Sequence, residues 1–137
     1  MKEYKCPQFK SDNSIIELID LLKFIPENTW IWSVLEYYGQ GIAPANLSIQ
    51  DFEDIARNRE TGFILTRKEL WKFAETSRNV IDCCIVGVSS FSDLDPSAFA
   101  MSDFSKCNIV LEVFDSSFWV VKTPDSLLIS TLQMAFT

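Results

Sequence analysis

Alternation of apolar and polar residues predicts a β-hairpin over residues 108–123. Two apolar runs flank a short polar insert, Asp115-Ser116-Ser117, whose side chains are typical of turns. In the first run Ile109, Leu111 and Val113 alternate with Asn108, Val110, Glu112 and Phe114, and in the second Trp119 and Val121 alternate with Phe118, Val120 and Lys122. Period-2 alternation of β-branched and aromatic residues around such an insert is typical of a hairpin. Because both faces carry apolar residues, we expect this hairpin in the centre of a sheet.

The same period predicts two further strands, at residues 28–38 and 79–89, and a brief extended segment at 63–65. In the first strand the residues expected to share one face are Trp30, Trp32, Val34, Glu36 and Tyr38. Gly87 in the second strand indicates a bulge or a close approach of another part of the chain. Residues 1–10 are mixed and are interpreted as an arm or a short edge strand.

Helical spacing of apolar residues predicts four helices. The Ser14-x-x-Glu17 spacing of a capping box favours a first helix over about 13–24, which Pro26 ends. Ser48 and Thr66 are expected to begin two more helices, extending to about residues 57 and 78. Thr123-Pro124 supplies a cap and a proline at the first helical position of a C-terminal helix, with Leu127 and Leu128 facing inward.

This order of elements predicts a single α+β domain over residues 1–137, with an antiparallel sheet of about four strands packed against three to four helices. The chain is 47% hydrophobic and 23% charged, which is typical of a globular protein. The N-terminal residues lack the apolar core of a signal peptide, and we expect a cytoplasmic protein. Its four cysteines are then expected to be reduced and mostly buried, including the neighbours Cys83 and Cys84.

Candidate catalytic residues are few. The chain has no histidine, which removes Ser-His-Asp and Cys-His catalysis together with the commonest metal ligand. Neither a glycine-rich phosphate-binding motif nor the cysteine spacing of a zinc site is present. We therefore expect a protein that is not an enzyme and holds no cofactor or metal. The alternative is a carboxylate- or metal-dependent hydrolase that uses Asp93, Asp95 and Asp103.

Charge and a long loop point instead to a protein partner. The net charge is -7, which disfavours binding of nucleic acid over a broad basic face. No basic residue occurs between positions 79 and 105, where acidic residues alternate with aromatic ones. The residues expected to contact a partner there are Phe91, Asp93, Asp95, Phe99 and Asp103. Acidic groups around aromatic anchors suit a basic protein surface, whereas rings that fold back onto the core would have only a structural role.

A second acidic cluster begins the helix at residue 48. It consists of Asp51, Glu53 and Asp54, which are also expected to contact the partner, although the sequence alone does not place them beside the loop. A third class of function is a homo-oligomeric scaffold that assembles through exposed aromatic strand faces, for example through Trp30 and Trp32. The more ordinary interpretation of these two rings is that they pack under a helix.

Three stretches carry a resemblance to a known class of protein: NTWIWSVLEYYGQG, LSIQDFEDIARNRETGFILTRKELWKFAETSRNVIDCCIVG and VLEVFDSSFWVVKTPDSLL. Together they span about residues 28–130, and they resemble the immunity proteins of bacterial polymorphic and contact-dependent growth inhibition toxin systems. The resemblance implies a cytoplasmic protein that binds and neutralises the C-terminal domain of a cognate toxin, without contact with a membrane. Many such toxins are nucleases with basic substrate-binding surfaces, which an acidic inhibitor would block.

Overall fold

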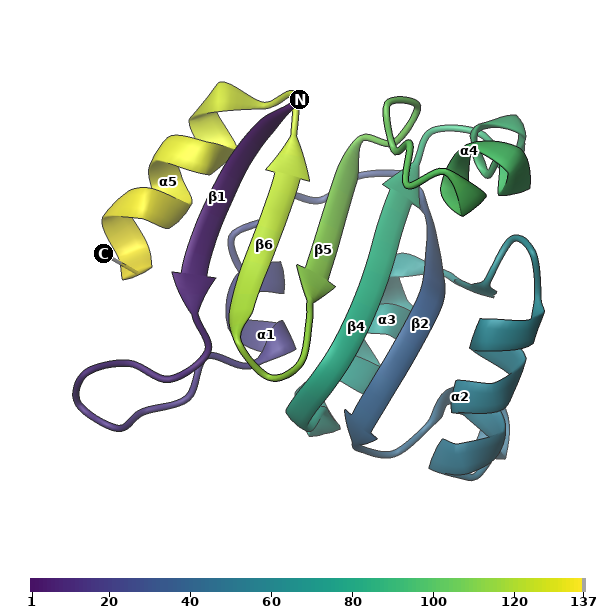
Figure 1. Ribbon diagram of the computed structural model, residues 1–137, viewed down its shortest axis with the longest axis horizontal. Helices are drawn as coiled ribbons and strands as arrows, with labels where there is room; N and C mark the ends of the chain where they lie inside the picture. Colours follow the sequence, from purple (N-terminus) through teal and green to yellow (C-terminus); the bar gives the residue numbers. More distant parts are fainter. Residues whose placement is uncertain (137) are drawn as a thin grey trace.

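An antiparallel sheet with the strand order β1-β6-β5-β4-β2-β3 forms the centre of the computed structural model, which describes residues 1–136 (Figure 1). The strands are β1 (Lys2–Pro7), β2 (Ile31–Gln40), β3 (Phe63–Leu65), β4 (Arg78–Val88), β5 (Ile109–Val113) and β6 (Phe118–Thr123). The helices are α1 (Leu18–Leu22), α2 (Ile49–Asn58), α3 (Arg67–Thr76), α4 (Pro96–Ala100) and α5 (Ser126–Phe136). The predicted α+β class is confirmed, but the described residues form six strands and five helices rather than about four strands and three to four helices.

The predicted hairpin is confirmed as β5 and β6, and it lies inside the sheet between β1 and β4. Asp115 and Ser116 both have positive φ angles, 50° and 53°, which is the pattern of a type I′ turn. Such turns match the twist of the strands they join. The additional strands lie at the two edges: residues 1–10 supply β1, which pairs with β6, and the brief segment at 63–65 supplies β3, which pairs with β2.

The strict alternation expected along β2 is wrong beyond Val34. The register with β4 shifts between Val34 and Glu36, so Leu35 is an extra residue at a β-bulge. Trp32, Val34 and Tyr37 consequently face the main core, whereas Glu36 and Tyr38 lie on the opposite face. Gly87 marks a close approach, as expected, because a Cβ atom there would lie 3.1 Å from the Trp30 ring and 3.3 Å from that of Trp32.

One face of the sheet is covered by α1, α2, α3 and α5, which enclose the main hydrophobic core with it. Ser48 and Thr66 cap α2 and α3 as predicted, through bonds from the Asp51 and Glu69 amides. The Trp71 ring of α3 packs edge-on against Trp32, with 5.9 Å between the ring centroids. The expected packing under a helix is therefore confirmed for Trp32, whereas Trp30 precedes β2 and is only partly buried.

The first and last helices begin later than predicted. Ser14 does not cap a helix, because its amide and hydroxyl both donate to Asp12 Oδ1, and α1 begins only after Glu17. Residues 8–16 instead form a hairpin-like loop, in which Phe9 and Ile15 make an isolated antiparallel β-bridge. At the C-terminus Asp125 rather than Thr123 caps α5, since its carboxylate accepts the amides of residues 127 and 128. Leu127 consequently points outward, contrary to expectation.

The opposite face of the sheet has a helix over only one end. There α4 and its flanking loops cover a second, smaller cluster formed by Val86, Val88, Leu94, Cys107 and Val110. In Figure 1 this helix lies in front of the sheet at the upper right, while the lower part of the same face has no helix in front of it. Within residues 1–136 no helix is long and apolar enough to cross a membrane.

Candidate partner-binding surface

The loop predicted to bind a partner is partly folded onto the sheet. Residues Phe91–Asp93 form a 3-10 turn, and Pro96–Ala100 form α4. The rings of Phe99 and Phe104 stack with 5.6 Å between their centroids and pack against the second cluster. Phe91, by contrast, is 61% exposed. Of the two predicted aromatic anchors, only Phe91 therefore presents most of its ring to solvent.

The acidic side chains of this loop bond to the loop itself. Asp95 is the N-cap of α4, accepting the amides of Ser97 and Ala98, and it also accepts a hydrogen bond of 2.9 Å from Lys106 Nζ. Asp103 accepts the amide of Ser105 at 3.0 Å. Asp93 is half-buried. Lys106 thus forms an ion pair with one of the three acidic side chains of the loop.

The hydrolase alternative gains no support from this arrangement. Among residues 1–136 no group of three His, Cys, Asp or Glu side chains is positioned to hold a metal ion. Asp95 and Asp103 are engaged in capping and turn bonds, and the charged group that interacts with all three carboxylates is the protein's own Lys106.

The acids of α2 do not join those of the loop. Asp51 is exposed in the first turn, and Asp54 pairs with Arg57 at 4.0 Å. Burial raises the pKa of Glu53, while a bond from the Gly39 backbone partly offsets this effect. The end of α2 that borders α4 is the basic one, because Arg57 and Arg59 line a hollow together with Pro96 and Phe99. The structure therefore places a basic end between the two predicted acidic clusters.

The Asp95–Lys106 pair gives a local test of this geometry. The Lys106 ammonium, helped by the amides of α4, holds the pKa of the Asp95 carboxyl below its usual value. Ionised Asp95 therefore stabilises the loop at neutral pH, and this contribution is lost as the pH falls through the lowered pKa. We expect Lys106→Ala to raise the pKa of Asp95, measured by carboxyl NMR titration, and to leave unchanged the pKa of Asp12, which hydrogen bonds from Ser14 lower. An unaltered Asp95 titration in this variant would contradict the ion pair.

The uncovered part of the sheet carries two rows of side chains that the strand register defines. One row runs Glu36, Cys84, Glu112, Val120 and Lys5 across β2, β4, β5, β6 and β1. In the next row Tyr38 on β2 pairs with Asp82 on β4. Extending the β4–β5 and β5–β6 registers by one residue brings Phe114 opposite Asp82 and Phe118 opposite Phe114. A bond of 2.9 Å from the Asp115 amide to Asp82 Oδ1 ties the hairpin turn to β4 at this point. We call these nine residues, together with Lys122 and Glu3 of the adjoining row on β6 and β1, the uncovered face.

Three aromatic rings of the uncovered face are exposed, two of them on β2 and β6 and the third, that of Phe114, in the turn between β5 and β6. Tyr38 is 54% exposed, Phe114 80% and Phe118 40%. Two shallow hollows of about 320 and 440 Å³ lie on either side of the face, the first lined by Phe114, Phe118 and Val120, the second by Leu35, Glu36 and Cys84. Exposed apolar patches of this kind on a folded domain mark sites of protein contact.

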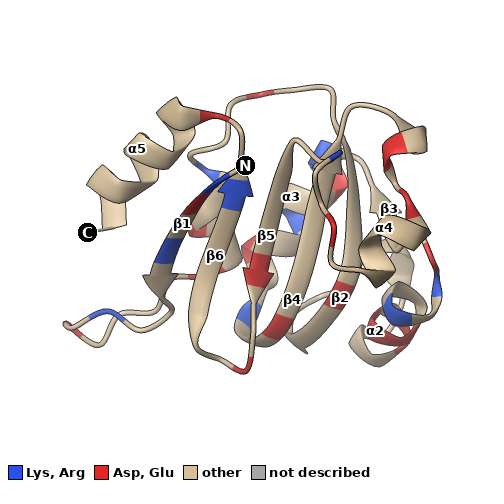
Figure 2. Ribbon diagram, turned by 45° about the horizontal axis from the view of Figure 1, so that its top comes forward, with Lys and Arg blue, Asp and Glu red and all other residues tan. Residues whose placement is uncertain are grey.

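The charges on the uncovered face are unequally distributed. β2, β4 and β5 carry acidic residues, β6 carries a lysine, and β1 carries both Glu3 and Lys5 (Figure 2). Burial, reinforced by the negative charges of Glu112 and Glu36, raises the pKa of the Cys84 thiol. Because the thiolate is the reactive form, Cys84 is a weak nucleophile at neutral pH. The face offers charge and aromatic surface rather than covalent chemistry.

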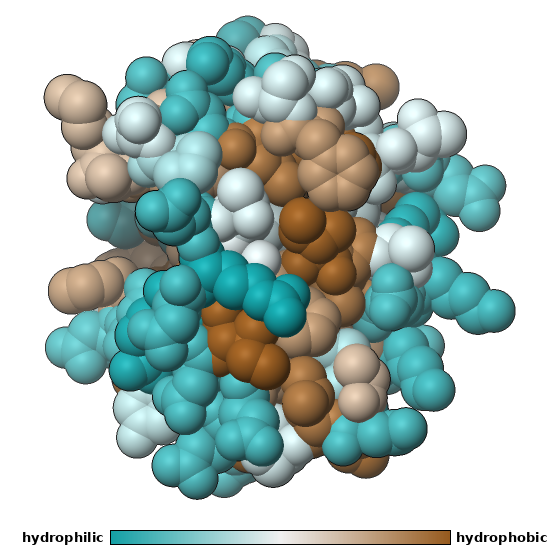
Figure 3. All heavy atoms as spheres, turned by 90° about the vertical axis from the view of Figure 1, so that its right-hand side faces the viewer, coloured by the Kyte–Doolittle hydropathy of each residue, from teal (hydrophilic) through white to brown (hydrophobic). Residues whose placement is uncertain are grey.

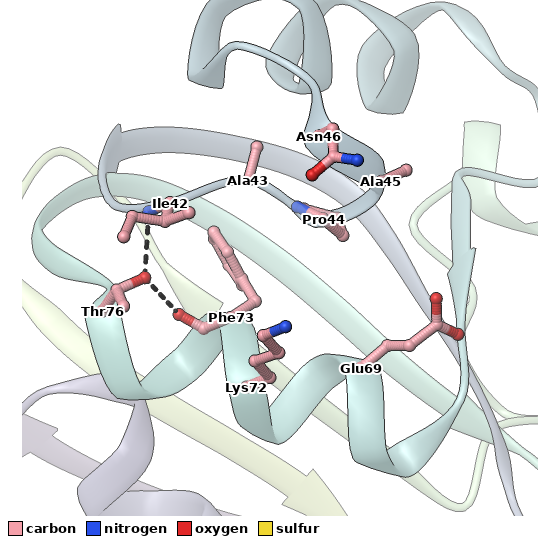
Figure 4. A pocket seen from close by; sticks show the side chains of 9 residues that line it. All are labelled: Ile42, Ala43, Pro44, Ala45, Asn46, Glu69, Lys72, Phe73 and Thr76. Atoms are coloured by element: carbon pink, nitrogen blue, oxygen red, sulfur yellow. Dashed lines mark hydrogen bonds between the residues drawn. The ribbon is translucent and has the colours of Figure 1, made fainter.

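Two other hollows lie away from this face. One of about 270 Å³ lies between the loop after β2 and α3, where Lys72 and Phe73 contribute to its wall (Figure 4). The polar groups there have structural partners: Thr76 Oγ1 donates to the Phe73 carbonyl and accepts the Ile42 amide, and the Glu69 carboxylate accepts the Thr66 amide. This arrangement does not assemble an acid–base pair.

The second hollow is a groove at the β3 edge of the sheet, where the surface shows a band of apolar atoms (Figure 3). It measures about 410 Å³, and the residues that line it include Trp30, Ile31, Ile64 and the exposed Phe91. Its charged residues are of both signs, since Arg67 and Glu69 both line it. This groove is where the structure places Phe91, well separated along the sheet from the hairpin turn.

The aromatic residues of the uncovered face were not among the predicted contacts. The available signal was the alternation in the hairpin, which places Phe114 and Phe118 on the face opposite Val113 and Trp119. That signal does not reveal which face the helices leave open.

No protein-family model matches the chain, and the curated proteins and solved structures compared with it gave no match either.

Proposed function

We propose that this protein is a non-enzymatic protein-binding module, and specifically an immunity protein that binds and neutralises a cognate bacterial toxin domain in the cytoplasm. The observation that supports the proposal most strongly is the uncovered face. It presents to solvent the rings of Tyr38 on β2, Phe118 on β6 and Phe114 in the turn that joins β5 to β6.

Such a face has the composition of a protein-binding hot spot. Aromatic side chains supply large contact area with few rotatable bonds, and hot spots are enriched in tyrosine and tryptophan. Tyr38 and Phe118 lie in strands, and the Phe114 carbonyl accepts the Ser117 amide in the hairpin turn, so these positions are fixed by backbone hydrogen bonds before a partner arrives. A pre-organised surface loses little conformational entropy on binding.

The charge of the chain fits a basic partner. With 19 acidic and 12 basic residues, the protein is expected to attract a basic surface over a distance and so to speed encounter. Nuclease-type toxin domains have such surfaces because they bind phosphates. They are the first candidates for the partner.

The test is co-expression with the C-terminal domain of a toxin whose gene lies beside the gene for this protein. We expect the protein to protect the host from that domain and to copurify with a catalytically inactivated form of it in a defined ratio. A non-cognate toxin domain of the same activity is the matched control, and it should remain toxic. If the protein gave no protection against the neighbouring toxin and formed no complex with it, the proposal would be refuted.

A further inference from the structure

We infer that the uncovered face is a receptor for lysine and arginine side chains of the partner, and that the protein's own Lys5 and Lys122 fill part of this receptor in the free state. The inference rests on the proposed function, since it specifies the chemistry by which a partner would be held. The ligand that this face would bind is a segment of the partner protein that carries several basic side chains.

The first observation is that two cations of the chain already lie on this face. Lys5 Nζ stands over the Phe118 ring, 4.8 Å from its centroid. Lys122 Nζ lies 3.0 Å from Glu112 Oε1 and 5.8 Å from the centroid of the Phe104 ring. Both lysines come from the β1–β6 side, and each meets an aromatic ring, which attracts a cation through its negative face. The surface therefore has the geometry to accept alkylammonium side chains.

The second observation is that the carboxylates on the β2–β4 side of the face form no ion pair among the described residues, although Arg57 and Arg59 line the same hollow as Glu36. These are the carboxylates of Glu36, which is exposed, and of Asp82. Asp82 uses Oδ1 for the Asp115 amide, which leaves its second oxygen for another donor. The rings of Phe114 and Tyr38 flank Asp82 in the same row and have no cation over them in this part of the chain.

The spacing of these groups suits arginine in particular. Neighbouring strands are about 4.8 Å apart, so Glu36 and Glu112, which are separated by β4, stand about 10 Å apart. Asp82 and the aromatic row lie two residues further along the strands, about 7 Å away. A guanidinium between the rows meets a carboxylate on one side and a ring face on the other. Its planar fork can pair with the first and stack on the second, which an ammonium does less well.

The acidic groups of α2 and of the loop at residues 89–105 lack this combination. On α2, Asp54 is paired with Arg57, and in the loop Asp95 is paired with Lys106. The aromatic rings nearest to that loop, Phe99 and Phe104, are stacked on each other and packed on the sheet. Charge complementarity combined with free aromatic surface therefore singles out the β2–β4–β5 part of the uncovered face.

A peptide titration tests this inference without the toxin. Isotope-labelled protein would be titrated with a nine-residue oligoarginine peptide, and with an oligocitrulline peptide of the same length as an uncharged control. We expect the amide shifts caused by oligoarginine to concentrate at residues 36–38, 82–84 and 112–118, with no comparable response to oligocitrulline. The double substitution Glu36→Gln with Asp82→Asn should weaken oligoarginine binding about fivefold or more. The side-chain amide oxygen that Asp82→Asn introduces can still accept the Asp115 amide, so the turn is retained.

The matched control is Asp51→Asn with Asp54→Asn, which removes two negative charges from α2 and is expected to weaken binding less than twofold. Equal weakening by both double variants, or shifts centred on α2 or on residues 89–105, would overturn the inference. Substituting Lys5→Met provides a second readout, because it uncovers the Phe118 ring and should strengthen oligoarginine binding. If the peptide maps to the uncovered face and the toxin does not bind, the receptor stands and only the proposed function fails.

Discussion

Replacing Trp119 with alanine is expected to lower the free energy of unfolding by about 3–5 kcal/mol, the usual cost of deleting a large aromatic ring from a core. The Trp119 side chain is fully buried, and its register partners on β1 and β5 are Cys6 and Val113. Its indole Nε1 donates a hydrogen bond of 2.7 Å to the Ile16 carbonyl. The substitution therefore leaves a cavity in the sheet and also a buried carbonyl that has lost its donor.

Urea unfolding monitored by circular dichroism measures this loss. Phe114→Ala is the matched control, because it removes a ring from the same hairpin at a position that is largely exposed. The control should change the free energy of unfolding by less than about 0.5 kcal/mol. A similar small change for Trp119→Ala would show that the ring does not connect the loop before α1 to the sheet.

The combined substitution Tyr38→Ala and Phe114→Ala is expected to weaken binding of the toxin domain about 30-fold or more, which corresponds to about 2 kcal/mol. The two rings flank Asp82 in one row of the uncovered face and contribute little to the core. Isothermal titration calorimetry measures the change in Kd, and unfolding curves check that the double variant remains folded.

Two exposed apolar residues away from the uncovered face are the controls for this loss. They are Met101, which follows α4, and Leu127 on α5, and substituting either with alanine should leave the Kd within about twofold. Phe91→Ala probes the groove at the β3 edge. If Phe91→Ala weakened binding more than the Tyr38 and Phe114 double variant, the partner would dock at that edge and the assignment of the surface would be wrong.

Elements that depend on neighbouring residues could be predicted from the sequence. The Ser48 and Thr66 caps and the turn at Asp115-Ser116 use bonds within four residues, and all three are present. The start of α1 depends on distant groups. Residues 8–16 are extended because Gln8 Nε2 bonds the Val80 carbonyl and Trp119 holds Ile16, contacts that no local pattern encodes.

The candidate site illustrates the same limit. A phenylalanine in a loop can fold back only where the strand face beneath it is apolar, and Val86 and Val110 supply that face for Phe99 and Phe104. The bulge at Leu35 turns Glu36 and Tyr38 away from the core, although strict alternation places them with Trp32. Which face the helices leave open is decided by the packing of the whole chain. The alternation therefore indicates on which side of the hairpin Phe114 and Phe118 lie. It does not indicate whether helices cover that side or leave it exposed to solvent.

A crystal structure of the complex with the toxin domain tests the central claim most directly. It should show the Tyr38, Phe114 and Phe118 rings buried beneath the partner, with basic side chains of the partner against Glu36 and Asp82. A complex in which these rings stay exposed, while the partner covers the helical side or the β3 edge, would contradict the claim.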